Sequence, residues 1–486
     1  MTIDNAARPP VLTFLSWQVA GLALLLSHVG LSLLSGAVAP AYAVTVPLVL
    51  LLYAADSMAG FAVFLQFLLY QNLAVSLASG SIDFELYRGL QGTSFALTLG
   101  LAAMAWCRLW KATSNRATLT VIAAAMAVVL AYTAIGALRS SPGSAAIYFR
   151  SSTIAMLGLL IGWDVGREHG YREVGLCYLT SMALGLVLAV CEVAAPLAYY
   201  DAIGAQDYYR LKYGSATINP TLDFRTAQDV LSYLSTSFFN FGGAAYETVR
   251  FGGPNMHSVS YAYVMSIGVL VASSLGIYAF AAAVLPLLVL IGVKGAAIMV
   301  AATAVLWIAG RRLGGAAMAV FGGAFGTAYI ALVIWYGLSL GDYHVLGLMG
   351  GIGGFLSNPL GHGIGVGGNL SSSVTSTDLG AGWHDFQLYG ADQALESAIG
   401  VLLYQMGIGA IAVLSVVWIS FRATVGHFRH SFGLIPLAIA VLLANSFFQE
   451  EAFSPYALGL LTIFAGVLSS RPREFAAAPQ PRYAFA

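Results

Sequence analysis

The sequence predicts an all-α integral membrane protein that crosses the bilayer about fourteen times, within a range of about 12–14 helices. Hydrophobic residues make up 59% of the 486 residues and charged residues only 9%, far below the roughly 25% of soluble domains. The apolar residues fall in long stretches, and a helix needs about 20 of them to cross the hydrocarbon. The polar residues gather in two long segments between these stretches. Lipid must therefore surround most of the chain.

The apolar stretches follow one another along the chain, with short polar turns between most of them. The spans are expected at 11–35, 38–55, 57–79, 91–107, 118–138, 146–163, 173–196, 254–273, 276–293, 295–310, 313–338, 395–421, 432–448 and 454–470. The closest neighbours, 276–293 with 295–310 and 11–35 with 38–55, could be single bent helices. The expected parts of the chain are N-terminal transmembrane helices (1–196), a loop (197–253), central transmembrane helices (254–338), a second loop (339–394), and C-terminal helices with a tail (395–486).

Basic residues orient these spans. If the N-terminus is cytoplasmic, most of the 21 Lys and Arg residues fall on the inner side, many of them in short loops such as Arg311–Arg312. This distribution follows the positive-inside rule. Both termini are therefore expected inside, and both long loops are expected to be extracytoplasmic. Residues 1–10 are polar and the first apolar stretch has no cleavage-like end, so no signal peptide is expected.

The composition also excludes several classes of partner. The net charge is zero and there is no basic run, so nucleic acid is not an expected partner. Cys107, Cys177 and Cys191 lie in or beside apolar spans without a CxxC motif, so neither a disulfide nor a zinc site is expected. The outward-facing histidines lack any metal-binding spacing, and no metal or other cofactor is expected.

The first outer segment is rich in tyrosine, Tyr246 among them, and carries Arg210 and Arg225. Aromatic rings at this depth either stack on sugar faces or anchor helices at the headgroups. A loop of this length on a protein with otherwise short loops is usually functional.

The segment ends in the run RFGGPNMH, residues 250–257, immediately before a span. Pro254 can begin the helix, which would place Arg250 beside backbone N–H groups at the outer interface. Such a site suits a phosphate or diphosphate, with Asn255 and His257 close by. The alternative is that Arg250 reaches out to lipid headgroups.

Lys294 interrupts two apolar stretches on the outer side. An ionisable residue at membrane depth usually faces a cavity and has a partner. A tight surface turn would instead leave Lys294 as a solvated interfacial charge.

The second outer segment contains a glycine-rich stretch around His362 and ends in a polar approach to the next span. The glycines lack the GK[ST] ending of a nucleotide loop, so a flexible loop whose backbone approaches a ligand is the better interpretation. His384, Asp392 and Glu396 are the candidate general bases, because a partly desolvated carboxylate gains affinity for a proton. Alternatively, Asp392 caps the helix and Glu396 pairs with a cation.

The last outer turn, residues 447–453, is short, acidic and aromatic. It either contributes to an acceptor-sugar subsite or is a solvated turn.

Four motifs in residues 250–420 together resemble the O-antigen ligase and O-antigen polymerase superfamily of bacterial inner membranes. Their order, spacing and sidedness carry the resemblance. In sequence order they are RFGGPN at 250–255, VKGA at 293–296, NPLGHG at 358–363, and an acidic approach from Asp392 to a span that contains GIG at 407–409.

This chain departs from the family in two places. Ligases of the family have a histidine ten residues before the glycine of the last motif, where this chain has Ser397, and this favours a polymerase. Lys294 replaces an arginine and so lacks the bidentate fork that binds phosphate.

The resemblance implies a metal-independent glycosyltransferase that polymerises lipid-linked oligosaccharide repeats on the periplasmic face of the bacterial inner membrane. The donor would be a glycan on polyprenyl diphosphate, and the product O-antigen, capsule or exopolysaccharide. The bilayer, a flippase and chain-length regulator proteins are the partners implied. The alternatives are ligase-type transfer to lipid A-core or protein, and a transporter of polysaccharide or lipid-linked glycan.

The resemblance also implies roles for particular residues. The diphosphate would be bound by Arg250, Lys294, Arg210 and Arg225. The base or sugar ligand would be Glu396, Asp392 or His384. The glycan would be held, or the loops shaped, by Asn255, His257, His362 and Tyr246.

Overall fold

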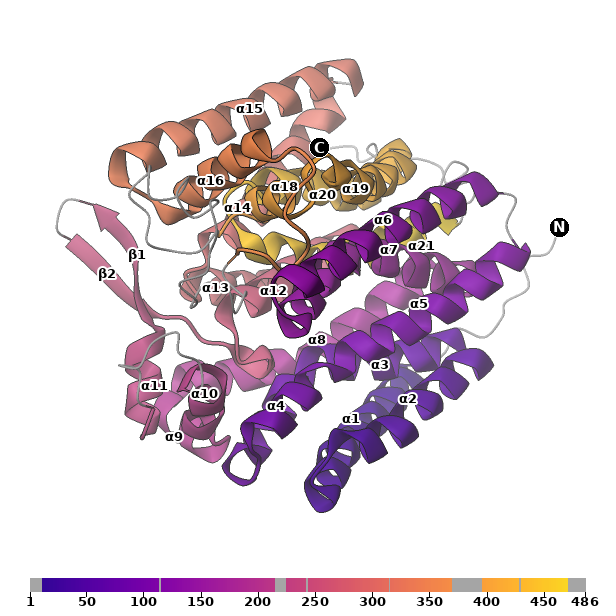
Figure 1. Ribbon diagram of the computed structural model, residues 1–486, viewed down its shortest axis with the longest axis vertical. Coiled ribbons are helices and arrows are strands. Elements are labelled where there is room, and N and C mark those ends of the chain that lie inside the picture. Colours follow the sequence, from indigo (N-terminus) through magenta and orange to yellow (C-terminus); the bar gives the residue numbers. More distant parts are fainter. Residues whose placement is uncertain are drawn as a thin grey trace, which may run out of the picture. The chain divides into compact units, whose positions relative to one another are not determined.

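The computed structural model describes residues 11–112, 115–214, 224–241, 244–313, 315–368, 396–427 and 430–470. Within these ranges almost every regular element is a helix, and the exception is one short hairpin of two strands (Figure 1). Ten of the helices are long and apolar enough to cross a membrane, and five shorter helices are also apolar. The protein is therefore an all-α polytopic membrane protein.

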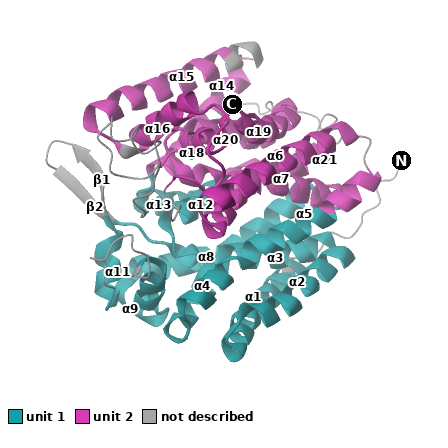
Figure 2. Ribbon diagram, viewed as in Figure 1, with its two compact units in different colours: residues 1–104, 168–268, 279–293 teal, residues 105–167, 269–278, 294–486 magenta. Residues whose placement is uncertain are grey.

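The chain forms two compact units, which Figure 2 shows in different colours. Unit 1 contains residues 1–104, 168–268 and 279–293, and unit 2 contains the rest. The elements of unit 1 are α1 (Val11–Ser35), α2 (Val38–Ala55), α3 (Ser57–Ala78), η1 (Ser79–Ser81), α4 (Phe84–Gln91), the first part of α5 (Thr93–Ala112), α8 (Tyr171–Ala194), α9 (Pro196–Ala202), α10 (Ala205–Tyr209), η2 (Arg210–Gly214), α11 (Ala227–Leu234), β1 (Ser235–Phe241), β2 (Ala244–Val249), η3 (Gly253–Asn255), most of α12 (Ser258–Ser274) and α13 (Tyr278–Leu290).

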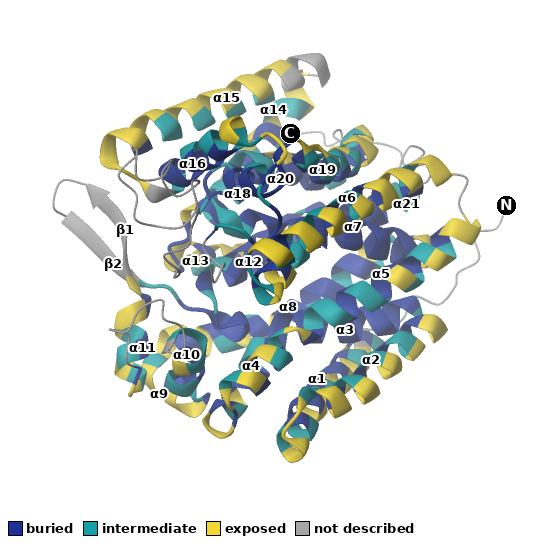
Figure 3. Cartoon of the chain, viewed as in Figure 1, coloured by how far each residue is buried: buried dark blue, intermediate teal, exposed yellow. Residues whose placement is uncertain are grey.

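Helix α3 forms the centre of unit 1. It packs against α1, α2 and α8 and is mostly buried, whereas α1 and α2 expose one side each (Figure 3). Asp56 begins α3 by accepting hydrogen bonds from the backbone N–H groups of Met58 and Ala59, as an N-cap does. Farther along α3, the Tyr70 hydroxyl donates to the Ser181 carbonyl of α8. Polar contacts of this kind hold helices together where lipid provides no hydrophobic driving force.

Unit 2 is also helical. Its elements are the end of α5, α6 (Arg116–Arg139), α7 (Pro142–Glu168, as far as residue 167), α14 (Lys294–Leu313), α15 (Gly315–Leu340), α16 (Tyr343–Ser357), α18 (Ala398–Met406), η5 (Gly407–Gly409), α19 (Ala410–Thr424), η6 (Val425–His427), η7 (Ser431–Gly433), α20 (Leu434–Asn445), η8 (Glu450–Phe453), η9 (Pro455–Gly459) and α21 (Leu460–Ser470).

A row of small residues brings α7 and α21 into close contact within unit 2. A Cβ atom added at Gly162 would lie 1.9 Å from the Ile463 carbonyl oxygen, and one added at Gly158 would lie 2.6 Å from that of Gly459. Spacing of small residues by four is the usual way for membrane helices to approach each other closely.

The long segments expected as loops contain regular structure. The segment 197–253 contains α10, α11 and the antiparallel β1–β2 hairpin, in which Ser235 pairs with Val249 and Phe241 with Ala244. The segment 339–394 begins with α16, which packs against α15 and α18. The expected span 395–421 is interrupted at η5, where Gly407 has a φ of 53°.

Candidate functional site

The RFGGPN run forms a buried turn in unit 1 that begins at the end of β2. The Arg250 backbone N–H donates to the Leu234 carbonyl at 2.9 Å, and Gly253 and Met256 both have positive φ, at 53° and 49°. A Cβ at Gly253 would lie 2.6 Å from the Tyr261 ring. Only glycine suits this position, since the backbone is left-handed and a ring lies against it.

A carboxyl group in the last turn of α8 fixes this turn. Glu192 is 2% exposed and accepts three hydrogen bonds: Gly252 N–H to Oε1 at 2.8 Å, Gly253 N–H to Oε2 at 2.7 Å, and the Tyr200 hydroxyl to Oε1 at 2.8 Å. The Asn72 amide of α3 donates to the Asn255 carbonyl at 2.7 Å. The turn is therefore attached to α3, α8 and α9, all of which belong to unit 1.

Arg250 itself is half-buried at this turn. Within the described residues its side chain forms no hydrogen bond or ion pair, and its Nε is shielded from water. Desolvation lowers the pKa of Arg250 from its ordinary value, although the group stays protonated. A partly desolvated cation without a carboxylate partner is suited to bind an anion.

Several other buried polar atoms near the turn have no hydrogen-bond partner in the part of the chain that the structure describes. Both side-chain amide atoms of Asn255 are in this state, although the residue is only 1% exposed. The hydroxyls of Tyr199 and Tyr261 and the side-chain carbonyl of Asn72 share it. Buried polar groups in proteins are almost always paired. This turn therefore offers unused donors and acceptors to water or to a ligand.

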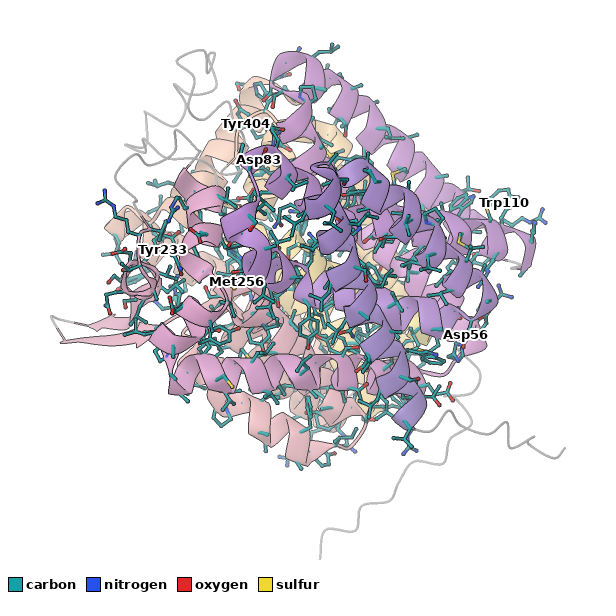
Figure 4. The ribbon with its side chains drawn as sticks, turned by 90° about the horizontal axis from the view of Figure 1, so that it is seen from below. Asp56, Asp83, Trp110, Tyr233, Met256 and Tyr404 are labelled. Atoms are coloured by element: carbon teal, nitrogen blue, oxygen red, sulfur yellow. The ribbon has the colours of Figure 1, made fainter. Side chains whose placement is uncertain are left out.

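An aromatic cluster precedes the turn in the sequence and belongs to the same unit. The rings of Tyr209, Tyr213, Phe224 and Tyr233 contact one another with centroids 5.3–6.2 Å apart. The Lys212 ammonium lies 5.0 Å from the Tyr213 centroid, as in a cation–π contact. Tyr233 and Met256 are labelled in Figure 4.

The other predicted residues of unit 1 have different surroundings. Arg210 forms an ion pair with Asp207 at 3.0 Å and donates to the Phe224 carbonyl, and Arg225 is exposed. His257 bonds Ser260 through Nδ1 at 2.7 Å, and desolvation, with a smaller effect of Lys212, lowers its pKa to about 3. His257 is therefore neutral at physiological pH. Tyr246 lies on β2, and its side chain is outside the described residues.

In unit 2, Lys294 is exposed at the first residue of α14. The next residue anchors that end: the Asn445 amide donates to the Gly295 carbonyl at 2.9 Å, and a Cβ on Gly295 would lie 2.1 Å from the Gln449 side chain. Lys294 is thereby held near the turn that follows α20.

Glu396 is the one described member of the three predicted bases. Its Oε2 lies 3.1 Å from Nδ1 of His344. Ser397 then caps α18 by accepting from the Gly400 N–H at 2.9 Å. Asp392 and His384 lie outside the described residues.

The described part of the glycine-rich loop is packed tightly against helices of unit 2. A Cβ at Gly363 would lie 2.6 Å from the Gly136 nitrogen of α6, and one at Gly365 would lie 2.5 Å from the Ala145 nitrogen of α7. His362 stacks on Tyr404 with centroids 4.2 Å apart, and its Nδ1 lies 3.0 Å from the Tyr404 carbonyl. Close packing therefore accounts for these glycines.

Sequence reasoning missed Glu192 and left Glu450 as part of a turn. For Glu192 the sequence holds a usable signal, because it is a carboxyl near the end of an apolar span and such residues are functional candidates by default. Glu450 lies in an acidic turn, but its burial depends on which helices surround the turn.

No family model, curated protein or solved structure matches the chain. Among the described residues there is no group of three or more His, Cys, Asp or Glu side chains placed to hold a metal ion.

Proposed function

We propose that the protein is a polymerase of lipid-linked oligosaccharide repeat units in the bacterial inner membrane. In this proposal it has about fourteen spans, and its two long segments lie on the periplasmic side. A sugar hydroxyl of one lipid-linked repeat attacks the anomeric carbon of a glycan on polyprenyl diphosphate, and polyprenyl diphosphate leaves. O-antigen, capsule and exopolysaccharide are the candidate products.

The observation that carries the proposal is Arg250, a half-buried cation that has no carboxylate partner among the described residues and lies on a turn fixed by Glu192. Cations held in place at the leaving group stabilise the charge that develops as the diphosphate departs. The unpaired amide of Asn255 adds a donor and an acceptor beside it. Lys294, Arg210 and Arg225 stay proposals for contacts to the diphosphate.

Carboxylates of unit 2 are proposed to serve the acceptor. Glu396 is one candidate for the base, and Asp392 and His384 stay proposals. The role of Ser397 as the cap of α18 supports a polymerase over a ligase, because a helix cap occupies the position where ligases of the resembling family have a histidine.

The test is a gel of lipid-linked glycans from a strain that lacks the gene. A polymerase defect leaves single lipid-linked repeats, whereas a ligase defect leaves full-length unattached chains. A transporter defect traps repeats on the cytoplasmic side. Wild-type ladders in the deletion strain would contradict the proposal.

Complementation with Arg250→Ala tests the site. Loss of charge-assisted bonds to the diphosphate is expected to lower kcat/KM by about 100-fold. Arg88→Ala is the matched control, because Arg88 is an exposed arginine of the same unit with no proposed role in the site, and near wild-type activity is expected there. Full polymer from Arg250→Ala would remove this residue from the mechanism.

A further inference from the structure

A small cavity in unit 2 lies among α7, α18 and η8. Its volume is about 20 Å³, close to the space of one water molecule. The polar residues that line it are Tyr148, Ser151 and Ser152 of α7, Gln405 of α18, and Glu450 of η8. Such a site accommodates a hydroxyl group of a larger ligand.

Glu450 lines this cavity and has one carboxyl oxygen that makes no hydrogen bond to a described residue. Its Oε1 is shielded from solvent and has no hydrogen-bond partner among the described residues, and Tyr148 donates a hydrogen bond to the carboxyl group. Unpaired buried carboxyl oxygens are uncommon. A residue that lines the cavity therefore has an oxygen that could accept a hydrogen bond from a donor.

We propose that Glu450 is the base that accepts the proton of the attacking sugar hydroxyl, and that this cavity holds that hydroxyl. The proposal rests on the proposed function. The hydroxyl proton moves to Glu450 Oε1 while the hydroxyl oxygen bonds to the anomeric carbon. The bond from that carbon to the diphosphate oxygen breaks, its electron pair leaves with polyprenyl diphosphate, and Glu450 later releases the proton to water.

The surroundings of Glu450 favour proton uptake. Burial, with the nearby negative charges of Glu451 and Glu396, raises its pKa to about 8, and the bond from Tyr148 opposes that rise. A base acts best when its pKa is near the working pH. Glu396 is less suited to the role, because its carboxylate lies against the His344 imidazole, 3.1 Å from Nδ1, instead of lining the cavity.

Among the described residues, few charged groups lie around η8. Glu451 lies on η8 itself, the pair of Glu396 and His344 lies beside α18, and Lys294 begins α14, whose Gly295 contacts Gln449. Tyr148 comes from α7, and Tyr404 and Tyr456 lie on α18 and η9. Glu450 forms no ion pair within the described residues.

The test is the initial rate of chain elongation on a synthetic polyprenyl-diphosphate-linked repeat, measured from pH 5.5 to 9 with the full chain in detergent. The wild-type rate should rise with pH through the Glu450 pKa. Glu450→Gln should lower kcat by about 10²–10⁴-fold and abolish that rise. Glu451→Gln is the matched neighbour: elongation persists, and the rise moves to lower pH because a negative charge is lost.

The outcomes separate the two proposals. If Glu450→Gln elongates within threefold of wild type with the same pH profile, while Arg250→Ala is inactive, the role of Glu450 is refuted and the polymerase proposal stands. If the wild-type protein extends no glycan, the proposed function fails first. If Glu450→Gln does not fold, Tyr148→Phe is tested in its place. Because the Tyr148 hydrogen bond lowers the Glu450 pKa, the increase of elongation rate with pH should then move to higher pH. If the elongation rate of Tyr148→Phe increases at the same pH as that of the wild type, the proposed role of Glu450 is refuted.

Discussion

Replacing Glu192 should release the turn that carries Arg250. Glu192→Ala removes the acceptor of two buried backbone N–H groups and of the Tyr200 hydroxyl. Each of these three buried donors, if left unpaired, costs about 1–3 kcal/mol, so the free energy of unfolding should fall by about 3–9 kcal/mol. Glu192→Gln keeps one acceptor oxygen but sets an amide donor against the Gly253 N–H, and its loss should be about 1–3 kcal/mol.

The assay is SDS-titrated unfolding in mixed micelles, together with hydrogen exchange at the Gly252 and Gly253 amides. Glu173→Gln is the matched control, because it changes the same residue type on the same helix and removes only a partly exposed pair with His169. That change should cost less than about 1 kcal/mol. If Glu192→Ala costs no more than Glu173→Gln, or exchange at the two glycines stays slow, the reasoning is refuted.

Three further predictions follow from the same contacts. Gly162→Leu should push α7 away from α21 and lower the free energy of unfolding by about 3 kcal/mol. Gly30→Ala should be near neutral, because no atom lies within 4 Å of the added Cβ. Equal losses for the two variants in SDS titration would contradict the close packing of α7 and α21. Arg250→Lys keeps the charge but loses the fork, so kcat/KM should fall about tenfold, less than in Arg250→Ala, and an equal fall would show that charge contributes nothing. The Glu450 pKa is raised from 4.5 to about 8, so the contribution of this residue to stability is full below pH 4.5 and is lost as pH rises through about 8. Glu450→Gln should therefore remove that part of the pH dependence of the free energy of unfolding. If the pH dependence is unchanged, another group is responsible for it.

The helices were predictable because their signal is local. A run such as 116–139 has to satisfy its backbone hydrogen bonds within itself in lipid, so apolar length alone indicates a span. The expected spans at 11–35, 38–55 and 57–79 match α1, α2 and α3 within a residue. The break at Gly407 and the start of α12 at Ser258 were not predicted, since both depend on the packing of neighbouring segments.

The candidate sites divide in the same way. Arg250 stood out in the sequence because a charge beside an apolar span is unusual. The sequence could not show that Arg250 has no carboxylate partner among the residues that the structure describes, or that Arg210 forms an ion pair with Asp207. The sequence separates Glu192 from Gly252 by 60 positions, so only folding could show that they are bonded.

By itself, the sequence determined that this is a multi-pass helical membrane protein. Each apolar segment satisfies its backbone hydrogen bonds within its own helix in lipid, so the hydropathy of that segment alone indicates a span. Tertiary structure decided which polar groups are buried, paired or left open. Glu192, which fixes a turn, and Glu450, which faces a cavity, are the same residue type with opposite surroundings. The difference arises because desolvation and hydrogen bonding depend on the neighbours that distant segments supply.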